Sequence, residues 1–281
     1  MNSTTRILSN EEIAPNLFEM VLDAPQVAAK AQAGQFAIAM SHAQGERIPL
    51  TLADWDAERG TVTLVIMALG TGTKKLCSLK EGEHLFAFAA PLGRPSHIKA
   101  VDTVVMVAGG LGVAPIYPIA KAFHSKNIRV VSILAARTKD LLIWENRLQA
   151  VSAETMIVTD DGSKGEKGLA TAPLTRLLAA DSNKRIGSVF AIGPAPMMYA
   201  CAEATRPFAV HTVVSLNTIM IDGTGMCGGC RVSVNGKPKF TCVDGPEFNA
   251  HELDWPSVLS RQKCYTHAEK CSLERYVENS K

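Results

Sequence analysis

The feature that most constrains the fold is a regular alternation of apolar strands and helices that begins near residue 100. A continuous apolar stretch, TVVMVAGG (103–110), precedes the helical pattern APIYPIAKAFHSK (114–126). Three further strand–helix pairs follow, with strands expected at 129–137, 154–162 and 188–194, helices at 141–151, 170–180 and 196–205, and one more strand at 210–217. This pattern predicts a parallel sheet with helices on both faces.

The first 98 residues follow a different pattern, in which short runs of β-forming residues are bounded by Gly, Pro or Asp. Their spacing predicts an antiparallel β-barrel or sandwich, with a helix at 73–82. The runs lie at 16–25, 34–40, 48–55 and 60–69. We therefore expect three parts: a β-barrel domain (1–98), an α/β domain (99–217), and a small cysteine-containing module with a polar helical tail (218–281).

Glycines stand at two strand ends of the predicted α/β domain. VAGGLGVAP (107–115) joins a strand to a helix, a context in which backbone N–H groups bind phosphate; the alternative is a tight crossover turn. Gly193 and Pro194 end a later strand, where open α/β sheets bind ligands, and would leave space for a flat ring. Asp160 and Asp161, in TDDGSKG, are typical turn formers.

The predicted barrel contains a second candidate phosphate site. Arg47 offers a charge and Thr51 a hydroxyl, whereas Gly70, Gly72 and Thr73 offer backbone N–H groups at a helix start. A surface charge and an ordinary β–α turn are the alternatives.

Three cysteines cluster near the C-terminus. Two residues separate Cys227 from Cys230, and eleven separate Cys230 from Cys242. Zinc sites made of four cysteines usually contain two CxxC pairs, but plant-type [2Fe–2S] sites use C-x4-C-x2-C and a distant cysteine. Asp222 stands where that pattern has its first cysteine, so we interpret Asp222, Cys227, Cys230 and Cys242 as the ligand set. The alternatives are a structural zinc or free thiols, with Asp222 as a turn residue.

The remaining cysteines and the histidines are assigned no chemistry. Cys77 and Cys201 lie in apolar helices and are expected in the core. Cys264 and Cys271 are seven residues apart on a predicted helix, which favours a buried or interface face over ligands for a second metal. No histidine forms a mixed cysteine–histidine cluster.

Charge and hydropathy exclude several classes of protein. The formal net charge is +2 and no basic run exceeds two residues, so we expect neither nucleic acid nor an anionic membrane as a partner. The uncharged stretch 103–120 contains three glycines and two prolines, which disfavours a membrane span. Glu11, Glu12 and Glu19 stand where a signal peptide would be apolar. With seven cysteines, three of them clustered, the chain is expected in the reducing cytoplasm.

Taken together, these motifs resemble the ferredoxin–NADP+ reductase superfamily, from about residue 5 to 260. The closer similarity is to the branch containing the dihydroorotate dehydrogenase electron-transfer subunit and the small subunit of NADH-dependent ferredoxin:NADP+ oxidoreductase, also called sulfide dehydrogenase subunit. The segments that carry the resemblance are ERIPLTLADW, AGGLGVAP, TDDGSKG, DGTGMCGGCRV and CVDGPEF.

The resemblance implies an FAD-binding barrel, an NAD-binding α/β domain and a [2Fe–2S] module. Matched to the family motifs, the flavin-side residues are Arg47, Pro49, Leu50 and Thr51, and the FAD-pyrophosphate loop is Gly70, Thr71, Gly72 and Thr73. The NAD-pyrophosphate loop is Gly109, Gly110, Gly112, Ala114 and Pro115, and the nicotinamide end is Gly193 and Pro194. No catalytic acid or base is implied, because FAD accepts the hydride itself.

Two departures from the family pattern affect the interpretation. Arg47 stands four residues before Thr51, whereas the superfamily arginine stands three before the Ser or Thr that faces the flavin. Asp222 replaces the first cysteine of the dihydroorotate branch, which favours the transhydrogenase-type branch. NADH is preferred over NADPH because Asp140 and Glu145 follow the basic end of the strand at Arg137 and would oppose a 2′-phosphate.

That branch implies electron transfer from NADH through FAD and the cluster to a larger iron–sulfur flavoprotein. It also implies electron bifurcation by the complex, with ferredoxin bound through the larger subunit. The alternatives are a dihydroorotate-type electron-transfer subunit and a non-catalytic, zinc-stabilised nucleotide-binding module.

Overall fold

The N-terminal domain consists of two antiparallel sheets that enclose a common apolar core. The computed structural model describes residues 5–278. One sheet has the order β5-β6-β2-β1-β7 and the other β4-β3-β8. Ile7 and Leu22 of the first sheet meet Ala37 and Leu50 of the second, and Leu76 closes the core. The elements are β1 (Thr5–Ala14), β2 (Leu17–Asp23), α1 (Pro25–Ala28), β3 (Phe36–Met40), β4 (Ile48–Thr51), β5 (Asp54–Asp56), β6 (Thr61–Met67), α2 (Thr71–Cys77), β7 (His84–Leu85) and β8 (Ala87–Leu92).

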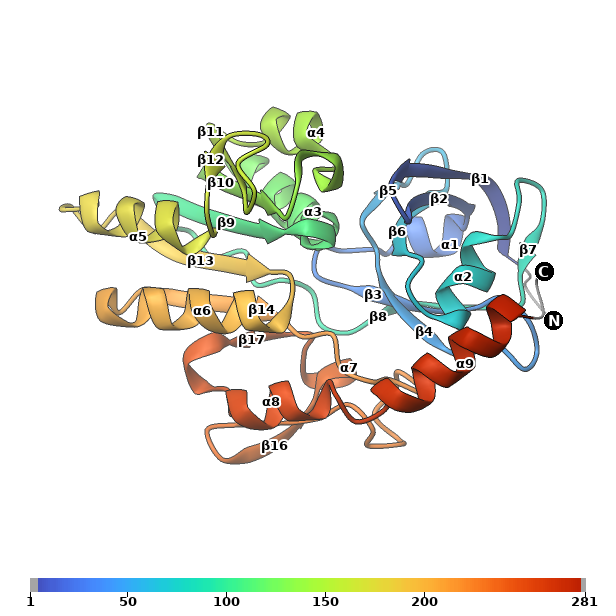
Figure 1. Ribbon diagram of the computed structural model, residues 1–281. Coiled ribbons are helices and arrows are strands. Elements are labelled where there is room, and N and C mark those ends of the chain that lie inside the picture. The colour runs from blue at the N-terminus through green and yellow to red at the C-terminus, as the bar shows by residue number, and fades with distance from the viewer. Residues whose placement is uncertain (1–4, 279–281) are drawn as a thin grey trace.

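The second domain is a seven-stranded sheet of order β12-β11-β10-β9-β13-β14-β17 (Figure 1). Its pairings are parallel except that of β17 with β14. Phe123 of α3 and Leu148 of α4 pack on one face, and Leu174 of α5 and Met198 of α6 on the other, which confirms the predicted arrangement. The elements are β9 (Thr103–Gly109), η1 (Gly110–Gly112), α3 (Val113–His124), β10 (Arg129–Ala136), η2 (Lys139–Leu141), α4 (Glu145–Ala150), β11 (Glu154–Thr159), β12 (Glu166–Lys167), α5 (Thr171–Ala180), β13 (Ile186–Ile192), α6 (Ala195–Thr205), η3 (Arg206–Phe208) and β14 (His211–Ser215).

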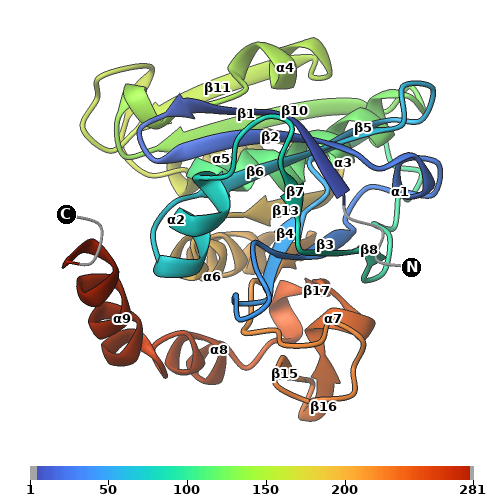
Figure 2. The ribbon, with the colours of Figure 1, turned by 90° about the vertical axis from the view of Figure 1, so that its right-hand side faces the viewer.

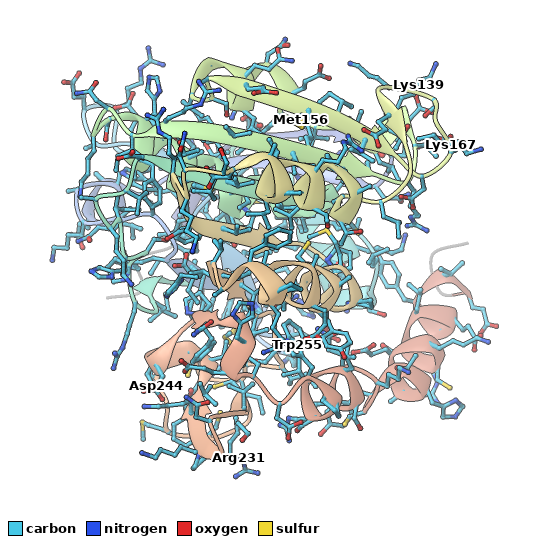
Figure 3. The ribbon with its side chains drawn as sticks, turned by 90° about the vertical axis from the view of Figure 1, so that its left-hand side faces the viewer. Lys139, Met156, Lys167, Arg231, Asp244 and Trp255 are labelled. Carbon is cyan, nitrogen blue, oxygen red and sulfur yellow. The ribbon has the colours of Figure 1, made fainter. Side chains whose placement is uncertain are left out.

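The C-terminal part attaches to both domains. It contains β15 (Arg231–Val234), β16 (Lys237–Phe240), α7 (Thr241–Asp244), β17 (Glu247–Asn249), η4 (Ala250–Glu252), α8 (Trp255–Arg261) and α9 (Thr266–Glu278). β17 extends the parallel sheet as an antiparallel edge strand, so the predicted module contributes to the α/β domain (Figure 3). The boundaries at residues 98 and 217 remain predictions.

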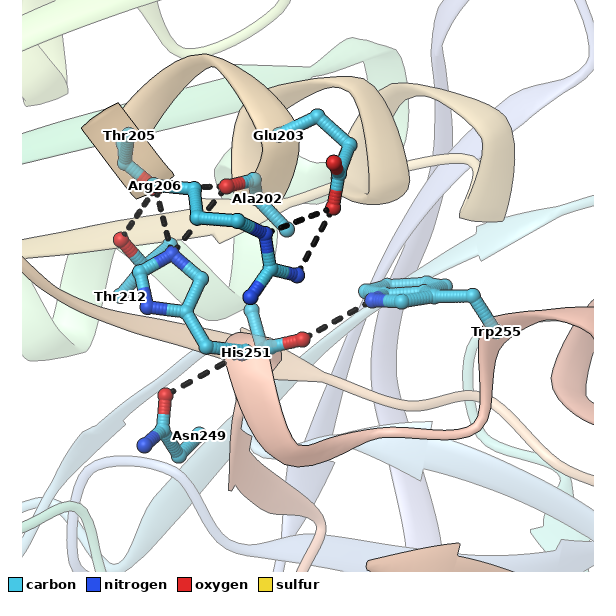
Figure 4. A network of polar contacts seen from close by, with 9 residues as sticks. Ala202, Glu203, Thr205, Arg206, Thr212, Asn249, His251 and Trp255 are labelled. Carbon is cyan, nitrogen blue, oxygen red and sulfur yellow. Dashed lines mark hydrogen bonds and ion pairs between the residues drawn. The ribbon is translucent and has the colours of Figure 1, made fainter.

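A polar network holds η4 against α6 (Figure 4). His251 Nε2 lies 3.1 Å from the Ala202 carbonyl and 2.9 Å from Thr205 Oγ1, and Thr212 donates to Thr205. The Trp255 indole N–H donates to the Ala250 carbonyl at 2.9 Å. Because buried polar groups need partners, this network fixes the position of the segment that follows the cysteines.

Helix α9 returns to the barrel and lies beside α2 (Figure 2). The hydroxyls of Thr71 and Ser272 are 3.0 Å apart, and Lys75 Nζ lies 5.9 Å from the centroid of the Tyr276 ring. Within residues 5–278, no helix combines the length and the apolar character that a bilayer crossing requires.

Candidate functional site

The predicted NAD-pyrophosphate loop lies at the carboxyl end of β9, where the chain passes through η1 into α3. A Cβ on Gly112 would overlap the Ile192 carbonyl oxygen, so this close approach requires glycine. Gly110 has a φ of +54° and open space around the position that a Cβ would take. Ala114 is buried and Pro115 follows it in the first turn of α3. The loop therefore leaves room for a ligand beside Gly110, while Gly112 packs against the backbone of β13.

The predicted nicotinamide end lies against this loop. A Cβ on Gly193 would stand 3.0 Å from the Cα of Gly109, and Pro194 begins the first turn of α6. The pairing of β13 with β9 brings these two strand ends together. Both turns thus lie at the carboxyl edge of the sheet, where α/β folds bind nucleotides.

The predicted flavin-side residues lie on β4 and at its start. Leu50 is buried in the barrel core, whereas Pro49 and Thr51 are half-buried and face the opposite side of the strand. Arg47 is exposed immediately before β4. Alternation along the strand therefore separates one core residue from two residues that face outward.

The predicted FAD-pyrophosphate loop forms the start of α2. Thr73 Oγ1 accepts the backbone N–H groups of Leu69 and Gly70, both at 3.1 Å. A Cβ on Gly72 would overlap the Glu46 carboxylate, so an anionic group already lies against this helix start. A helix start attracts anionic groups, and the Glu46 carboxylate would have to move aside for the diphosphate of FAD to bind there.

Within the cysteine loop, Asp222 organises the backbone. Its carboxylate accepts the N–H groups of Thr224 and Cys227 at 2.8 and 2.9 Å, and these hydrogen bonds hold the pKa of Asp222 below its ordinary value. Gly223, Gly225 and Gly228 all have positive φ, which lets the chain wind around this carboxylate.

The two buried cysteines meet at the base of the loop. Cys230 Sγ and Cys242 Sγ are 3.2 Å apart, and the N–H of Cys242 donates to Cys230 Sγ at 3.5 Å. Burial, with the contact to Cys230, raises the pKa of Cys242 to about 12. A bound cation would favour the thiolate that burial alone disfavours.

The four predicted ligands do not form a closed site. Cys227 is exposed, with the Gly229 N–H 3.5 Å from its Sγ. Across residues 5–278, no group of three or more His, Cys, Asp or Glu side chains is close enough to hold a metal ion. The chemistry of the set still fits an iron–sulfur cluster, because thiols, nearby N–H donors and a glycine-rich loop are what such a cluster needs.

The flavin-side strand and the cysteine pair share one face of the small sheet. β3 pairs with β4 so that Ile38 lies opposite Pro49 and Phe36 opposite Thr51. Residues opposite each other in an antiparallel pair point to the same face. Ile38 and Phe36 are also the barrel residues that pack in one apolar cluster with Met220, Cys230 and Cys242. One two-strand face therefore connects the predicted flavin site to the cysteines.

The other sulfur and histidine predictions have mixed outcomes. Cys77 and Cys201 are buried as expected, and burial raises the pKa of each to about 12. One histidine does lie near a cysteine, a pair that was not predicted from the sequence: His267 Nε2 is 3.9 Å from Cys271 Sγ one helical turn away. Cys271 is half-buried and Cys264 exposed, so the predicted buried face holds only in part.

Two contacts near the site were not predicted. Ser96 in the interdomain linker donates to the Glu247 carboxylate at 2.5 Å, and burial raises the pKa of Glu247 to about 7. Glu19 of β2 binds Trp144 and Arg147 across the two domains. In the sequence, both contacts are marked only by a glutamate within a strand, Glu247 for the first and Glu19 for the second.

Known proteins resemble this chain along its length. Residues 217–254 match the family model for the iron–sulfur cluster binding domain of dihydroorotate dehydrogenase B. A Thermotoga maritima protein named as a homologue of the dihydroorotate dehydrogenase B (NAD+) electron transfer subunit is 42% identical over 98% of this chain and 96% of its own. The corresponding subunit of Bacillus pumilus is 30% identical over 88% of this chain and 96% of its own.

Solved structures agree with these relatives. The structure of an NADH-dependent reduced ferredoxin-NADP oxidoreductase, reported for flavin-based electron bifurcation, contains a chain 40% identical to this one. The two superpose with a TM-score of 0.91, covering 99% of both chains. Reductases, reductase domains and a self-sufficient cytochrome P450 monooxygenase at 16–19% identity superpose with TM-scores of 0.59–0.63, which shows a common fold.

Proposed function

We propose a function from one established premise: the chain belongs to the family of dihydroorotate dehydrogenase B electron-transfer subunits and their homologues. In this proposal it oxidises NADH, or reduces NAD+, at FAD and relays single electrons through a [2Fe–2S] cluster. The electrons pass to a larger iron–sulfur flavoprotein in an electron-bifurcating NADH-dependent ferredoxin:NADP+ oxidoreductase. The clustered thiols agree with a cytoplasmic location.

The observation that carries the proposal is the shared face of β3 and β4. Pro49 and Thr51 occupy one strand of that face, and Ile38 and Phe36, on the other strand, pack against Cys230 and Cys242. The proposed flavin site and the proposed cluster therefore lie against adjacent strands on the same face of one sheet.

The residues of this chain bind and orient the proposed cofactors. Gly109, Gly110 and Gly112 present backbone N–H groups to the NAD diphosphate, and Gly193 with Pro194 leaves a flat edge for the nicotinamide. Gly70 to Thr73 receive the diphosphate of FAD. FAD, when bound, supplies the conversion of a two-electron hydride into single electrons.

The surface around the cysteine loop supports a protein partner. Ile219, Ile221, Met226 and Val243 are exposed by 41%, 55%, 89% and 37%. Ile219, Ile221 and Met226 lie within eight residues of the exposed Cys227, and a Cβ on Gly225 of the same loop would stand 3.1 Å from the Val243 side chain. Exposed apolar side chains that gather in one place are typical of docking surfaces. We propose that the larger subunit covers this surface and receives the electrons there.

Asp222 is proposed as the fourth cluster ligand. Both of its carboxylate oxygens already accept backbone N–H groups, which leaves lone pairs free for iron. Asp222→Cys should keep a cluster and shift its reduction potential, because ligand type and charge set that potential. An unchanged potential and spectrum would show that Asp222 only shapes the loop.

The proposed function is tested by the visible spectrum of the purified chain. Flavin and [2Fe–2S] bands that both bleach on addition of NADH support it. A colourless protein that contains zinc would favour the non-catalytic alternative, against which the iron–sulfur family match already weighs.

A dihydroorotate-type dehydrogenase remains the second candidate, favoured by the names of the matched family and relatives. The transhydrogenase type is favoured because the chain from the bifurcating enzyme is 40% identical over 99% of this chain, whereas the Bacillus pumilus dihydroorotate subunit is 30% identical over 88%. Co-purification of the native partner, followed by assays with ferredoxin and NADP+ and with dihydroorotate, distinguishes the two.

A further inference from the structure

Trp144 adopts a backbone conformation that a bulky residue rarely takes. It stands at the amino end of α4 with φ +56° and ψ 23°, in the left-handed region. A tryptophan has no local reason to occupy this region, so the contacts of its side chain must hold it there.

Three contacts fix the Trp144 indole. Its Nε1–H donates to Glu19 Oε2 at 2.6 Å, the Arg147 guanidinium lies 4.3 Å from the ring centroid, and the Tyr117 ring meets its edge at 5.5 Å and 76°. Tyr117, Trp144 and Arg147 belong to the α/β domain, whereas Glu19 belongs to the barrel. The indole is therefore clamped between the two domains.

Glu19 is the only one of these residues on the barrel side. Its second oxygen accepts a hydrogen bond from Arg147 Nη2 at 2.9 Å. It lies directly opposite Glu11 in the pairing of β1 with β2, so two like charges share one face of the sheet. The Arg147 cation offsets that repulsion and orients the Glu19 carboxylate toward α4.

The two domains also share an apolar core. Leu17, Ala53 and Val65 of the barrel pack in one cluster with α3 and the parallel sheet, and in Figure 1 α3 and α4 lie on the barrel side of that sheet. Burial of apolar surface keeps the two domains together, but it is non-directional and does not fix how one domain is rotated against the other. A second polar link, Lys121 to Asp54 at 3.0 Å, joins more exposed side chains, so it holds the orientation only weakly.

We propose that Glu19 is a positioning residue, whose hydrogen bonds to Trp144 and Arg147 fix the rotation of the α/β domain against the barrel. This inference rests on the proposed function, since that rotation sets how Gly193 and Pro194 face β4. Misplacement of reacting groups by about 1 Å can cost up to roughly a hundredfold in rate.

The test compares matched variants of the full, cofactor-loaded chain. Glu19→Gln keeps the shape of the side chain but removes the charge that binds Arg147, and Trp144→Phe removes only the indole donor. Glu11→Gln is the control for charge, and Asp54→Asn the control for the second link. Stopped-flow mixing with NADH measures the rate of flavin bleaching per bound flavin. Hydrogen exchange, which needs no activity, measures the protection of residues 144–150.

We expect Glu19→Gln and Trp144→Phe to lower the saturating rate roughly tenfold, with the KM for NADH and the flavin content unchanged. Exchange at 144–150 should accelerate in both variants and in neither control. Unchanged rates and exchange, or equal changes in Glu11→Gln, would overturn the inference. If NADH fails to bleach the wild-type flavin, the proposed function is wrong, and the exchange result alone judges the domain contact.

Discussion

The parallel sheet and the cysteine module are built in different ways. β9, β10 and β13 are covered on one face by α3 and α4 and on the other by α5 and α6, all helices of the same domain. The module, by contrast, buries Met220, Cys230 and Cys242 against Phe36 and Ile38 of the barrel. The sheet is covered by helices of its own domain and by β17, η4 and α8 of the module, whereas the cysteine loop is buried against strands about two hundred residues earlier.

This difference predicts where damage spreads. A defect in the sheet should unfold the chain, because the core cluster on one face includes barrel residues and the cluster on the other face includes residues of the C-terminal part. A defect at the contact between the module and the barrel should release the cysteine loop and leave the sheet folded. Four substitutions test this distinction.

The largest effect is expected from Gly112→Val in the sheet. Its side chain would overlap the Ile192 carbonyl oxygen, a backbone atom that cannot move aside. We expect a loss of about 4 kcal/mol or more in the free energy of unfolding, or no folded protein. Denaturant titration measures it. Gly110→Ala is the control, because its site is open and only its positive φ resists a side chain, at about 1–2 kcal/mol.

The next effect is expected from Ile38→Ala, which removes packing between the barrel and the module. Ile38 is buried, and its side chain lies against Gly223 of the cysteine loop. A Cβ on Gly223 would stand 2.9 Å from Ile38 Cγ1. The cavity should cost about 2–5 kcal/mol. Hydrogen exchange should accelerate in residues 220–244 and the cluster should be lost more easily, with β9, β10 and β17 still protected. Equal loss of protection in the sheet would mean that the module is not a separate unit.

The sequence predicts the parts of the fold that show a local pattern, and it does not predict contacts between residues that are distant in sequence. A strand such as β9 is recognisable because all of its residues are buried and all but Thr103 are apolar. β1 was missed because only Thr5 and Ile7 along it are buried, so it shows no apolar run. The spacing of Cys227, Cys230 and Cys242 pointed to the iron–sulfur segment, which the family match confirms. The contact of Cys230 and Cys242 with Ile38 depends on tertiary packing and leaves no local pattern.

A pH-dependent effect is expected at Glu247, which joins the module to the linker. Its folded pKa of about 7 lies above its ordinary value of 4.5, because burial disfavours the carboxylate. Between these values the unfolded chain releases a proton that the folded chain keeps, so stability falls as pH rises from 4.5 to 7. Glu247→Gln should remove this slope and be relatively more stable at pH 8 than at pH 4. Parallel wild-type and variant curves of unfolding midpoint against pH would contradict the assignment.

The smallest effect is expected from Ser272→Ala on α9. It removes one hydroxyl–hydroxyl hydrogen bond to Thr71, which joins the C-terminal helix to α2 of the barrel. A neutral hydrogen bond contributes about 0.5–1.5 kcal/mol, and partial exposure favours the lower end. Thermal unfolding should shift slightly, with no change in either the cluster or the sheet. A large loss of flavin binding would show that α9 belongs to the barrel site.

The central claim is that electrons pass from the proposed flavin to the proposed cluster, which lie against the same face of β3 and β4. Stopped-flow absorbance of the full chain with NADH tests it directly, with and without FAD. The account predicts that the flavin band bleaches first and the cluster band second, and that the cluster of FAD-depleted protein stays oxidised. A cluster that NADH reduces without FAD, or that stays oxidised beside a reduced flavin, would contradict it.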